Sequence, residues 1–248
     1  LTGLDLSAGS KNLSLLIQVA EGSADPDMPV QPVVWSYLVN DVWYGFTGSE
    51  ILADGSNGLL RSGIIRFALP KAMNSDNQTL PSGRHWLKAS VSRNTAAVCK
   101  VIALHSQALT ASFRDQGNAP SHLATPLESG VISKLQQRNA AIKKVSQPYA
   151  SFGGKVAEAD DAFYVRVSER LRHKGRAVSL FDYERLVLQA FPQVYKVKCI
   201  NHARRHLEHA PGSVLVTVVP DLRNRNAVDP LRPKVSLDTL DQINDYLS

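Results

Sequence analysis

The sequence predicts a multidomain α+β protein. An N-terminal all-β domain of sandwich or barrel type is followed by a smaller α+β domain of the α/β-sandwich kind. The first observation is a series of short apolar stretches, separated by Gly, Pro, Asn and Asp, across residues 1–115. This spacing is typical of antiparallel all-β domains. The second observation is that helix-spaced and strand-spaced stretches succeed one another from residue 151 onward. The 248 residues have room for one large or two modest domains.

The β-rich domain, residues 1–115, consists of strand-like stretches bounded by turn residues. Asn40 and Asp41 separate two of these stretches by two residues, which is typical of a tight hairpin. The predicted strands cover residues 13–20, 33–39, 42–46, 63–69, 85–91 and 97–104.

Residues 116–150 are expected to connect the two domains. Residues 116–126 have the Gly, Asn, Pro and Ser content of a linker. Five apolar residues then have the spacing of one helix face, so we expect a helix that bridges the two halves and ends at Pro148. These residues are Leu127, Val131, Leu135, Ile142 and Val145.

The α+β domain, residues 151–248, is expected to open with a helix. This helix should begin in the acidic run from Glu158 to Asp161, because carboxylates suit the positive end of a helix dipole. It should end at Gly175 in the left-handed conformation. Its apolar stripe, which is expected to pack, consists of Phe163, Val167 and Leu171.

A second helix, two strands and a third helix complete the prediction. Ser179 followed by Asp182 predicts a capping box at the start of the second helix. Residues 194–200 and 214–219 have strand patterns, and Ser236 is positioned to cap the last helix.

Two expectations concern what lies beyond this sequence. A sheet of two strands is marginal by itself, so we expect further strands, either beyond Ser248 or from a partner. The chain begins at Leu1 and stops directly after a helical pattern, so we expect a fragment whose α+β domain is truncated at its C-terminal end. No stretch approaches the roughly 20 apolar residues of a membrane span, and no secretion signal is present in this sequence.

The net charge of +6 is concentrated in residues 161–206, which hold ten Lys and Arg against four Asp and Glu. Such a segment would suit a nucleic-acid-binding protein, which is one alternative function. However, the two signs are interleaved at helical spacing, as at Arg166, Glu169 and Arg170. This pattern favours a salt-bridged or protein-facing surface.

Two sets of possible metal ligands have simpler interpretations. Cys99 and Cys199 each fall in a predicted strand, so we expect buried reduced thiols, with a disulfide or a metal pair as alternatives. His202, His206 and His209 have a zinc-like spacing only if the chain is helical there. Because they lie between two predicted strands, we expect exposed loop histidines.

The sequence predicts no enzyme activity and no cofactor. The G-x-S-x-G motif and the glycine-rich phosphate-binding motifs are absent. Gly153 and Gly154 precede a helix that could bind an anion, but the acidic residues that follow oppose this. Trp35, Trp43 and Trp86 are expected in the sandwich core. A carbohydrate-binding β-sandwich module, with these rings on its surface, is the second alternative function.

The order of motifs between residues 152 and 220 resembles one protein family. A Gly-Gly pair, a helix with regularly spaced arginines, the string RAVSLFDYE and the strand FPQVYKVKC follow one another. This order resembles the baseplate J-like family, the wedge proteins of phage-type contractile tails. The strings SERLRHKGRA, DYERLVLQAFP and KVKCINH are most similar to the wedge baseplate proteins of extracellular contractile injection systems, the headless phage tail-like toxin injectors.

The resemblance implies a structural baseplate wedge component that mediates assembly around the tube and attachment of the sheath. The implied partners are other baseplate, sheath and tube proteins, and copies of itself or of a paralogous wedge protein. Neither a membrane nor nucleic acid is among the expected partners. The implied location is the bacterial cytoplasm during assembly and then the baseplate of the particle.

For these contacts we expect the mixed-charge surface around the first helix of the α+β domain. Local pairing of Arg170 and Arg172 with nearby carboxylates is the alternative. The candidate assembly-interface residues are Arg166, Glu169, Arg170, Arg172, Lys174 and Arg176.

Overall fold

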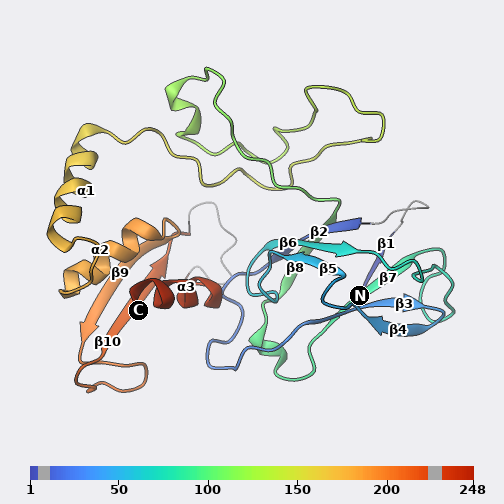
Figure 1. Ribbon diagram of the computed structural model, residues 1–248, viewed down its shortest axis with the longest axis horizontal. Coiled ribbons are helices and arrows are strands. Elements are labelled where there is room, and N and C mark those ends of the chain that lie inside the picture. The colour runs from blue at the N-terminus through green and yellow to red at the C-terminus, as the bar shows by residue number, and fades with distance from the viewer. Residues whose placement is uncertain (5–11, 223–230) are drawn as a thin grey trace. The chain divides into compact units, whose positions relative to one another are not determined.

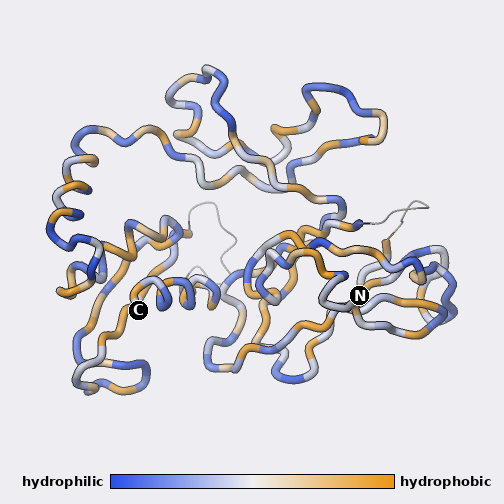
Figure 2. The backbone as a smooth tube through the Cα atoms, in the orientation of Figure 1, coloured by the Kyte–Doolittle hydropathy of each residue, from blue (hydrophilic) through white to orange (hydrophobic). Residues whose placement is uncertain are grey.

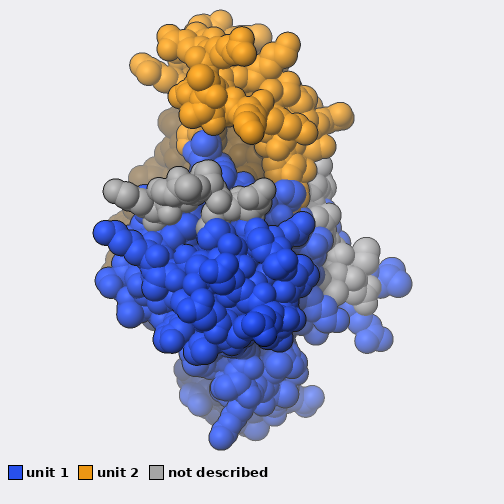
Figure 3. All heavy atoms as spheres, turned by 90° about the vertical axis from the view of Figure 1, so that its right-hand side faces the viewer, with its two compact units in different colours: residues 1–110, 177–248 blue, residues 111–176 orange. Residues whose placement is uncertain are grey.

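The computed structural model describes residues 1–4, 12–222 and 231–248 (Figure 1). The chain divides into two compact units (Figure 3). Unit 1 comprises Leu1–Thr110 and Ala177–Ser248, and unit 2 comprises Ala111–Arg176. Unit 1 therefore joins the β-rich part to most of the C-terminal part, and the second boundary lies inside the predicted α+β domain.

Two four-stranded antiparallel sheets form the N-terminal part of unit 1. Their strand orders are β1-β7-β3-β4 and β5-β6-β2-β8. The strands are β1 Thr2–Leu4, β2 Asn12–Val19, β3 Val34–Val39, β4 Val42–Gly45, β5 Ile51–Asp54, β6 Gly63–Ala68, β7 His85–Ser90 and β8 Val101–Ser106.

The two sheets share one hydrophobic core, as expected for a sandwich. Leu13, Leu15 and Ile17, which alternate along β2, are each 1% exposed, because every second residue of a strand points to the same face. Trp35 from one sheet meets Phe67 from the other edge-to-face, with 5.2 Å between the ring centroids. Trp35 therefore lies in the sandwich core, as predicted from the sequence.

The predicted hairpin joins β3 to β4. Its two central residues, Asn40 and Asp41, have φ values of 45° and 65°. A tight two-residue turn of type I′ requires positive φ at both positions, and Asn and Asp adopt it at low cost.

Two strands, β1 and β5, were not predicted, and β8 starts later than predicted. A 3-10 helix, η1 (Thr95–Ala97), occupies the expected start of β8. Cys99 follows it as a single buried residue whose N–H donates to the Leu59 carbonyl at 3.1 Å. The prediction that Cys99 lies in a strand is therefore wrong, because this loop contact replaces a sheet ladder.

The C-terminal part of unit 1 consists of α2 (Leu180–Ala190), β9 (Val194–Asn201), β10 (Val214–Pro220) and α3 (Leu237–Leu247). The predicted capping box of α2 is present. The Ser179 side chain accepts the Asp182 N–H at 3.3 Å, and the Asp182 carboxylate accepts the Ser179 N–H at 2.9 Å. Ser236 caps α3, as predicted, by accepting the Thr239 N–H.

A second hydrophobic core forms where the helices cover the two-stranded antiparallel sheet of β9 and β10. It comprises Val187, Phe191, Val194, Val197 and Ile243. Hydrophobic residues run along most of β10 (Figure 2), whereas in β9 they alternate with Lys196 and Lys198. The α+β class predicted from the sequence is confirmed.

Helix α3 connects the two cores of unit 1. Leu237, its first residue, packs against the sandwich core, whereas Ile243 belongs to the second core. The carboxylate of Asp238 accepts hydrogen bonds from Asn57 at 2.7 Å and from Arg61 at 3.1 Å. The loop between β5 and β6 is thereby attached to the last helix.

Unit 2 contains α1 (Asp160–His173) and a 3-10 helix, η2 (Pro120–Leu123). The helix predicted from Leu127 to Val145 is absent, and this segment consists of turns and extended backbone. Gly130 lies inside this segment at φ 82°, a left-handed conformation that an α-helix does not contain. The segment also has no core to pack against: neither hydrophobic core described above contains a residue of unit 2. Short helices need such packing for stability.

Candidate functional site

Helix α1 carries four of the six candidate interface residues, and the other two follow its last residue. It begins at Asp160 in the acidic run, as predicted, with Asp160 and Asp161 in its first turn. Of the predicted stripe, Phe163 is 43% and Leu171 69% exposed, and Val167 is half-buried, so none of the three is fully buried. The helix therefore presents large apolar side chains beside its charges.

Arg166 is held by a carboxylate that precedes the helix. Its Nε and Nη2 donate to the two carboxylate oxygens of Glu158, with distances of 2.8–3.1 Å. The hydrogen bonds from Arg166 lower the pKa of Glu158, and the pair in turn raises the pKa of Arg166. The guanidinium also lies over the Phe163 ring, 5.3 Å from its centroid. Both side chains are well exposed, so this pair orients Arg166 and contributes little stability.

The last turn of α1 gathers the remaining candidate cations. The helix ends with Lys174 at φ 50° and Gly175 at φ 73°, so Gly175 adopts the predicted left-handed conformation. The Arg170 guanidinium lies so close to Gly175 that a Cβ there would be 2.7 Å from its Nη1. Cations at this end suit the negative end of the helix dipole. Glu169 and Arg172 lie on the same helix, and Lys174 and Arg176 are exposed just beyond its last residue.

His173 is the one buried side chain in this turn, at 4% exposure. Its Nδ1 accepts the Gly175 N–H at 2.9 Å, so the proton of the neutral ring belongs on Nε2. Nε2 is buried without a hydrogen-bond partner among the described residues. The imidazole thus stabilises the left-handed turn that presents Lys174 and Arg176.

The histidines of the connection between β9 and β10 do not lie on one helix face. His202 and His206 have φ values of 54° and 63°, so the connection is not helical. No cluster of three or more His, Cys, Asp or Glu residues in the described ranges is placed to hold a metal. His206 instead lies 3.6 Å from the Asp27 carboxylate, which also pairs with Arg205 at 2.7 Å.

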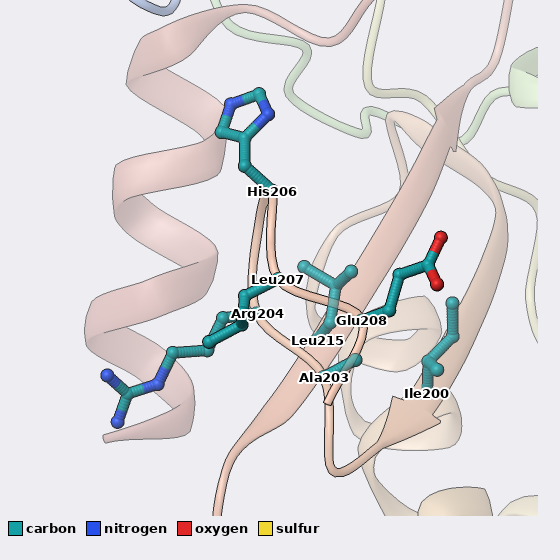
Figure 4. Close-up of a pocket in the computed structure, with 7 residues that line it drawn as sticks. All are labelled: Ile200, Ala203, Arg204, His206, Leu207, Glu208 and Leu215. Atoms are coloured by element: carbon teal, nitrogen blue, oxygen red, sulfur yellow. The ribbon is translucent and has the colours of Figure 1, made fainter. Parts of the chain in front are cut away.

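An open pocket of about 450 Å³ lies at this connection (Figure 4). Its apolar lining includes Leu207 and Leu215, and in Figure 4 the Arg204 and His206 side chains point in different directions. The Arg204 guanidinium is held by the Ser213 hydroxyl at 2.7 Å. The polar groups therefore do not converge on one point, as a catalytic constellation requires.

Several cations of the basic segment 161–206 have local partners. Besides Arg166, Lys198 pairs with Glu184 at 3.2 Å and Arg205 with Asp27. A cation engaged with a carboxylate is less available to a phosphate backbone. These contacts support the interpretation that the mixed charges are salt-bridged.

The surroundings of Trp43 bear on the alternative of a carbohydrate-binding module. Lys88 covers the Trp43 ring, with its Nζ 4.6 Å from the centroid. Trp43 borders a cavity of about 430 Å³, together with Asp41 and Lys88. The Asp41 carboxylate is occupied by the N–H groups of Gln78 and Thr79, which lower its pKa. Lys88 thus lies over one face of the Trp43 ring, and the Asp41 carboxylate already accepts hydrogen bonds from the chain itself.

Both cysteines are free and buried. Their burial agrees with the prediction. Among the helices in the described ranges, none has the length and apolar character needed to cross a membrane.

Two of the three comparisons with known proteins found a match. A family model described as "Baseplate protein PVC11-like" matches residues 3–248. A comparison with curated proteins found no match. Among solved structures, the chain is similar to a chain in the cryo-EM structure of the anti-feeding prophage baseplate, six-fold symmetrised. The identity is 17% and the TM-score 0.38, over 96% of this chain and 53% of that chain.

The chain thus spans about half the length of the solved chain that it matches. The family match extends from the sandwich through unit 2 to the end of α3. It confirms the relationship to baseplate proteins that the motif order between residues 152 and 220 indicated. The chain belongs to the PVC11-like family of baseplate proteins.

Proposed function

We propose that this protein is a structural wedge component of the baseplate of a phage tail-like contractile injection system. In this role it mediates assembly around the tube and attachment of the sheath. The observation that carries the proposal is the family match over residues 3–248. The proposed partners are other baseplate, sheath and tube proteins, with copies of itself or of a paralogous wedge protein. Assembly takes place in the bacterial cytoplasm.

The proposed role is mechanical rather than catalytic. A wedge protein must keep a rigid body while it presents surfaces to several neighbours. Unit 1 contributes two packed cores, and α3 contacts both of them. Helix α1 presents exposed apolar side chains and charges of both signs, a composition that suits a specific protein interface.

The first test is co-purification. The full-length protein is tagged and expressed with its neighbouring genes, and the recovered proteins are identified by mass spectrometry and imaged by negative-stain electron microscopy. We expect sheath, tube and other baseplate proteins, or plate-like particles. Recovery of the protein alone, or with nucleic acid only, would contradict the proposal.

The second test concerns the candidate interface. Reversing the charge of Arg166 and Arg172 to Glu is expected to block assembly, because like charges then face the partner's carboxylates. A matched control reverses Lys71 and Arg93, two exposed cations of unit 1, and so changes the net charge equally. Circular dichroism should show both variants folded. Assembly of the Arg166 and Arg172 variant at wild-type yield would exclude these residues from the interface.

A further inference from the structure

Residues 127–151 of unit 2 form a closed loop. The Ser151 N–H donates to the Leu127 carbonyl at 2.8 Å, and the Leu127 N–H donates to the Ser151 hydroxyl at 2.8 Å. Further along, the Gly130 N–H donates to the Gln147 carbonyl at 2.9 Å, and the Ile132 N–H to the Gln147 side chain at 3.0 Å. The two ends are thus fixed beside each other. The residues between them project as one loop.

The loop has an unusual composition for a surface segment. Between residues 129 and 148 there is no acidic and no aromatic residue. Its four cations are all exposed, and no ion pair to them is found among the described residues; they are Lys134, Arg138, Lys143 and Lys144. Four aliphatic side chains accompany them, each 42–58% exposed; they are Val131, Ile132, Leu135 and Ile142.

This combination is typical of a surface that binds another molecule. Single exposed aliphatic residues are ordinary, but several in one short loop are typical of an interaction site. Because residue 130 interrupts the helical pattern, these side chains cannot be collected on one buried helix face. The closing hydrogen bonds use the backbone, Gln147 and Ser151, so they hold the loop without using any of the eight side chains.

We propose that the loop 127–151 docks on an acidic surface with an apolar groove, on a neighbouring protein of the baseplate. The proposal rests on the assembly role proposed above. Charge identifies the occupant: residues 111–176 hold eleven Lys and Arg against six Asp and Glu, whereas the rest of the chain holds 17 against 16. The rest of this chain therefore has a net charge close to zero and would not attract the basic loop. An acidic neighbour gains both attraction and burial of the aliphatic residues.

Two other classes of partner fit the loop less well. Proteins that bind single-stranded nucleic acid stack bases on aromatic rings, and interfacial membrane segments insert Trp or Phe. Residues 129–148 contain none of these. Aliphatic side chains between cations are better suited to a protein groove.

The test replaces the four cations with glutamine: Lys134→Gln, Arg138→Gln, Lys143→Gln and Lys144→Gln. The control replaces four exposed cations of unit 1: Lys71→Gln, Arg84→Gln, Arg93→Gln and Lys100→Gln. A third variant replaces Val131, Ile132, Leu135 and Ile142 with serine. The probe is the set of co-expressed baseplate proteins purified without this chain, and binding is measured at 0.1 M salt, a concentration at which charges still attract over about 10 Å.

The loop-cation and aliphatic variants should each bind about tenfold or more weakly, and the control should bind like the wild type. Hydrogen exchange should show slower exchange of residues 131–145 on binding. Wild-type affinity of both loop variants would overturn the loop proposal and leave the proposed function standing. Loop-dependent binding to DNA or anionic vesicles, without binding to the baseplate proteins, would overturn it as well. Failure of the wild type to bind any baseplate protein would refute the proposed function and the loop proposal together.

Discussion

Replacing Asp238 with alanine tests how unit 1 is held together. The Asp238 side chain is 9% exposed and lies in the first turn of α3. It accepts hydrogen bonds from Asn57 at 2.7 Å and Arg61 at 3.1 Å, and a third from Gln242 at 2.9 Å. Two of these three donors belong to the sandwich, so the substitution removes polar contacts between the sandwich and α3.

The expected loss is about 2–4 kcal/mol of unfolding free energy. Hydrogen bonds to a charged group contribute roughly 1.5–3 kcal/mol each when both partners are buried. The Arg61 side chain is 42% exposed and can return to water, which lowers its share. A carboxylate in the first turn adds about 0.3–1 kcal/mol through the helix dipole. For a chain of this size, the melting temperature should fall by roughly 5–15 °C.

The assay is urea unfolding followed by tryptophan fluorescence, because Trp35 lies in the sandwich core. The control is Asp241→Ala on the same helix, an exposed residue whose loss should cost less than about 0.5 kcal/mol. A double-mutant cycle with Arg61→Ala should give a coupling energy of about 0.5–3 kcal/mol. If Asp238→Ala is no more destabilising than Asp241→Ala, the contacts to Asn57 and Arg61 do not hold α3 in place.

Two further predictions concern Glu184 and the two cysteines. The hydrogen bond from the Cys199 N–H, together with Lys198, lowers the pKa of Glu184 below its ordinary 4.5. The ionised Glu184 therefore stabilises the folded protein above pH 4.5, and this contribution is lost as the pH falls through the lowered pKa. Glu184→Gln should therefore flatten the loss of stability between pH 5 and pH 3 in urea titrations, and an unchanged slope would show that Glu184 is not involved. Burial, and then Glu184, raises the pKa of the Cys199 thiol, and Cys99 is also buried. Both thiols should react with Ellman's reagent in urea but not in native buffer; rapid labelling of the native protein would contradict their burial.

Sequence patterns predicted correctly those features that are set by residues close together in the chain. The alternation in β2, the Asn40-Asp41 turn and the Ser179-Asp182 capping box all depend on residues within a few positions of one another. Strands β1 and β5 could not be predicted, because they are short and are defined by pairing with β7 and β6. The helix predicted from Leu127 is absent for a related reason: its spacing indicated a buried face, but neither core among the described residues includes this segment.

The candidate site was only partly accessible to sequence reasoning. The cations at the end of α1 lie within one helical turn of one another, so the sequence alone predicts that they cluster. The pairing of Arg166 with Glu158 spans eight residues, beyond the three or four at which helix neighbours meet, so no periodicity signals it. The loop 127–151 also escaped prediction, because its closure depends on hydrogen bonds between its distant ends.

The position of α3 in the chain has a consequence for the order of folding. The sandwich strands are synthesised first, yet Leu237 packs on their core and Asp238 meets Arg61 from 177 residues away. Contacts between such distant segments form slowly, since a long loop must close first. We expect the sandwich to emerge from the ribosome with the site for α3 uncovered. Until α3 is synthesised and packs, a chaperone or another subunit could bind an apolar surface that is covered in the folded protein.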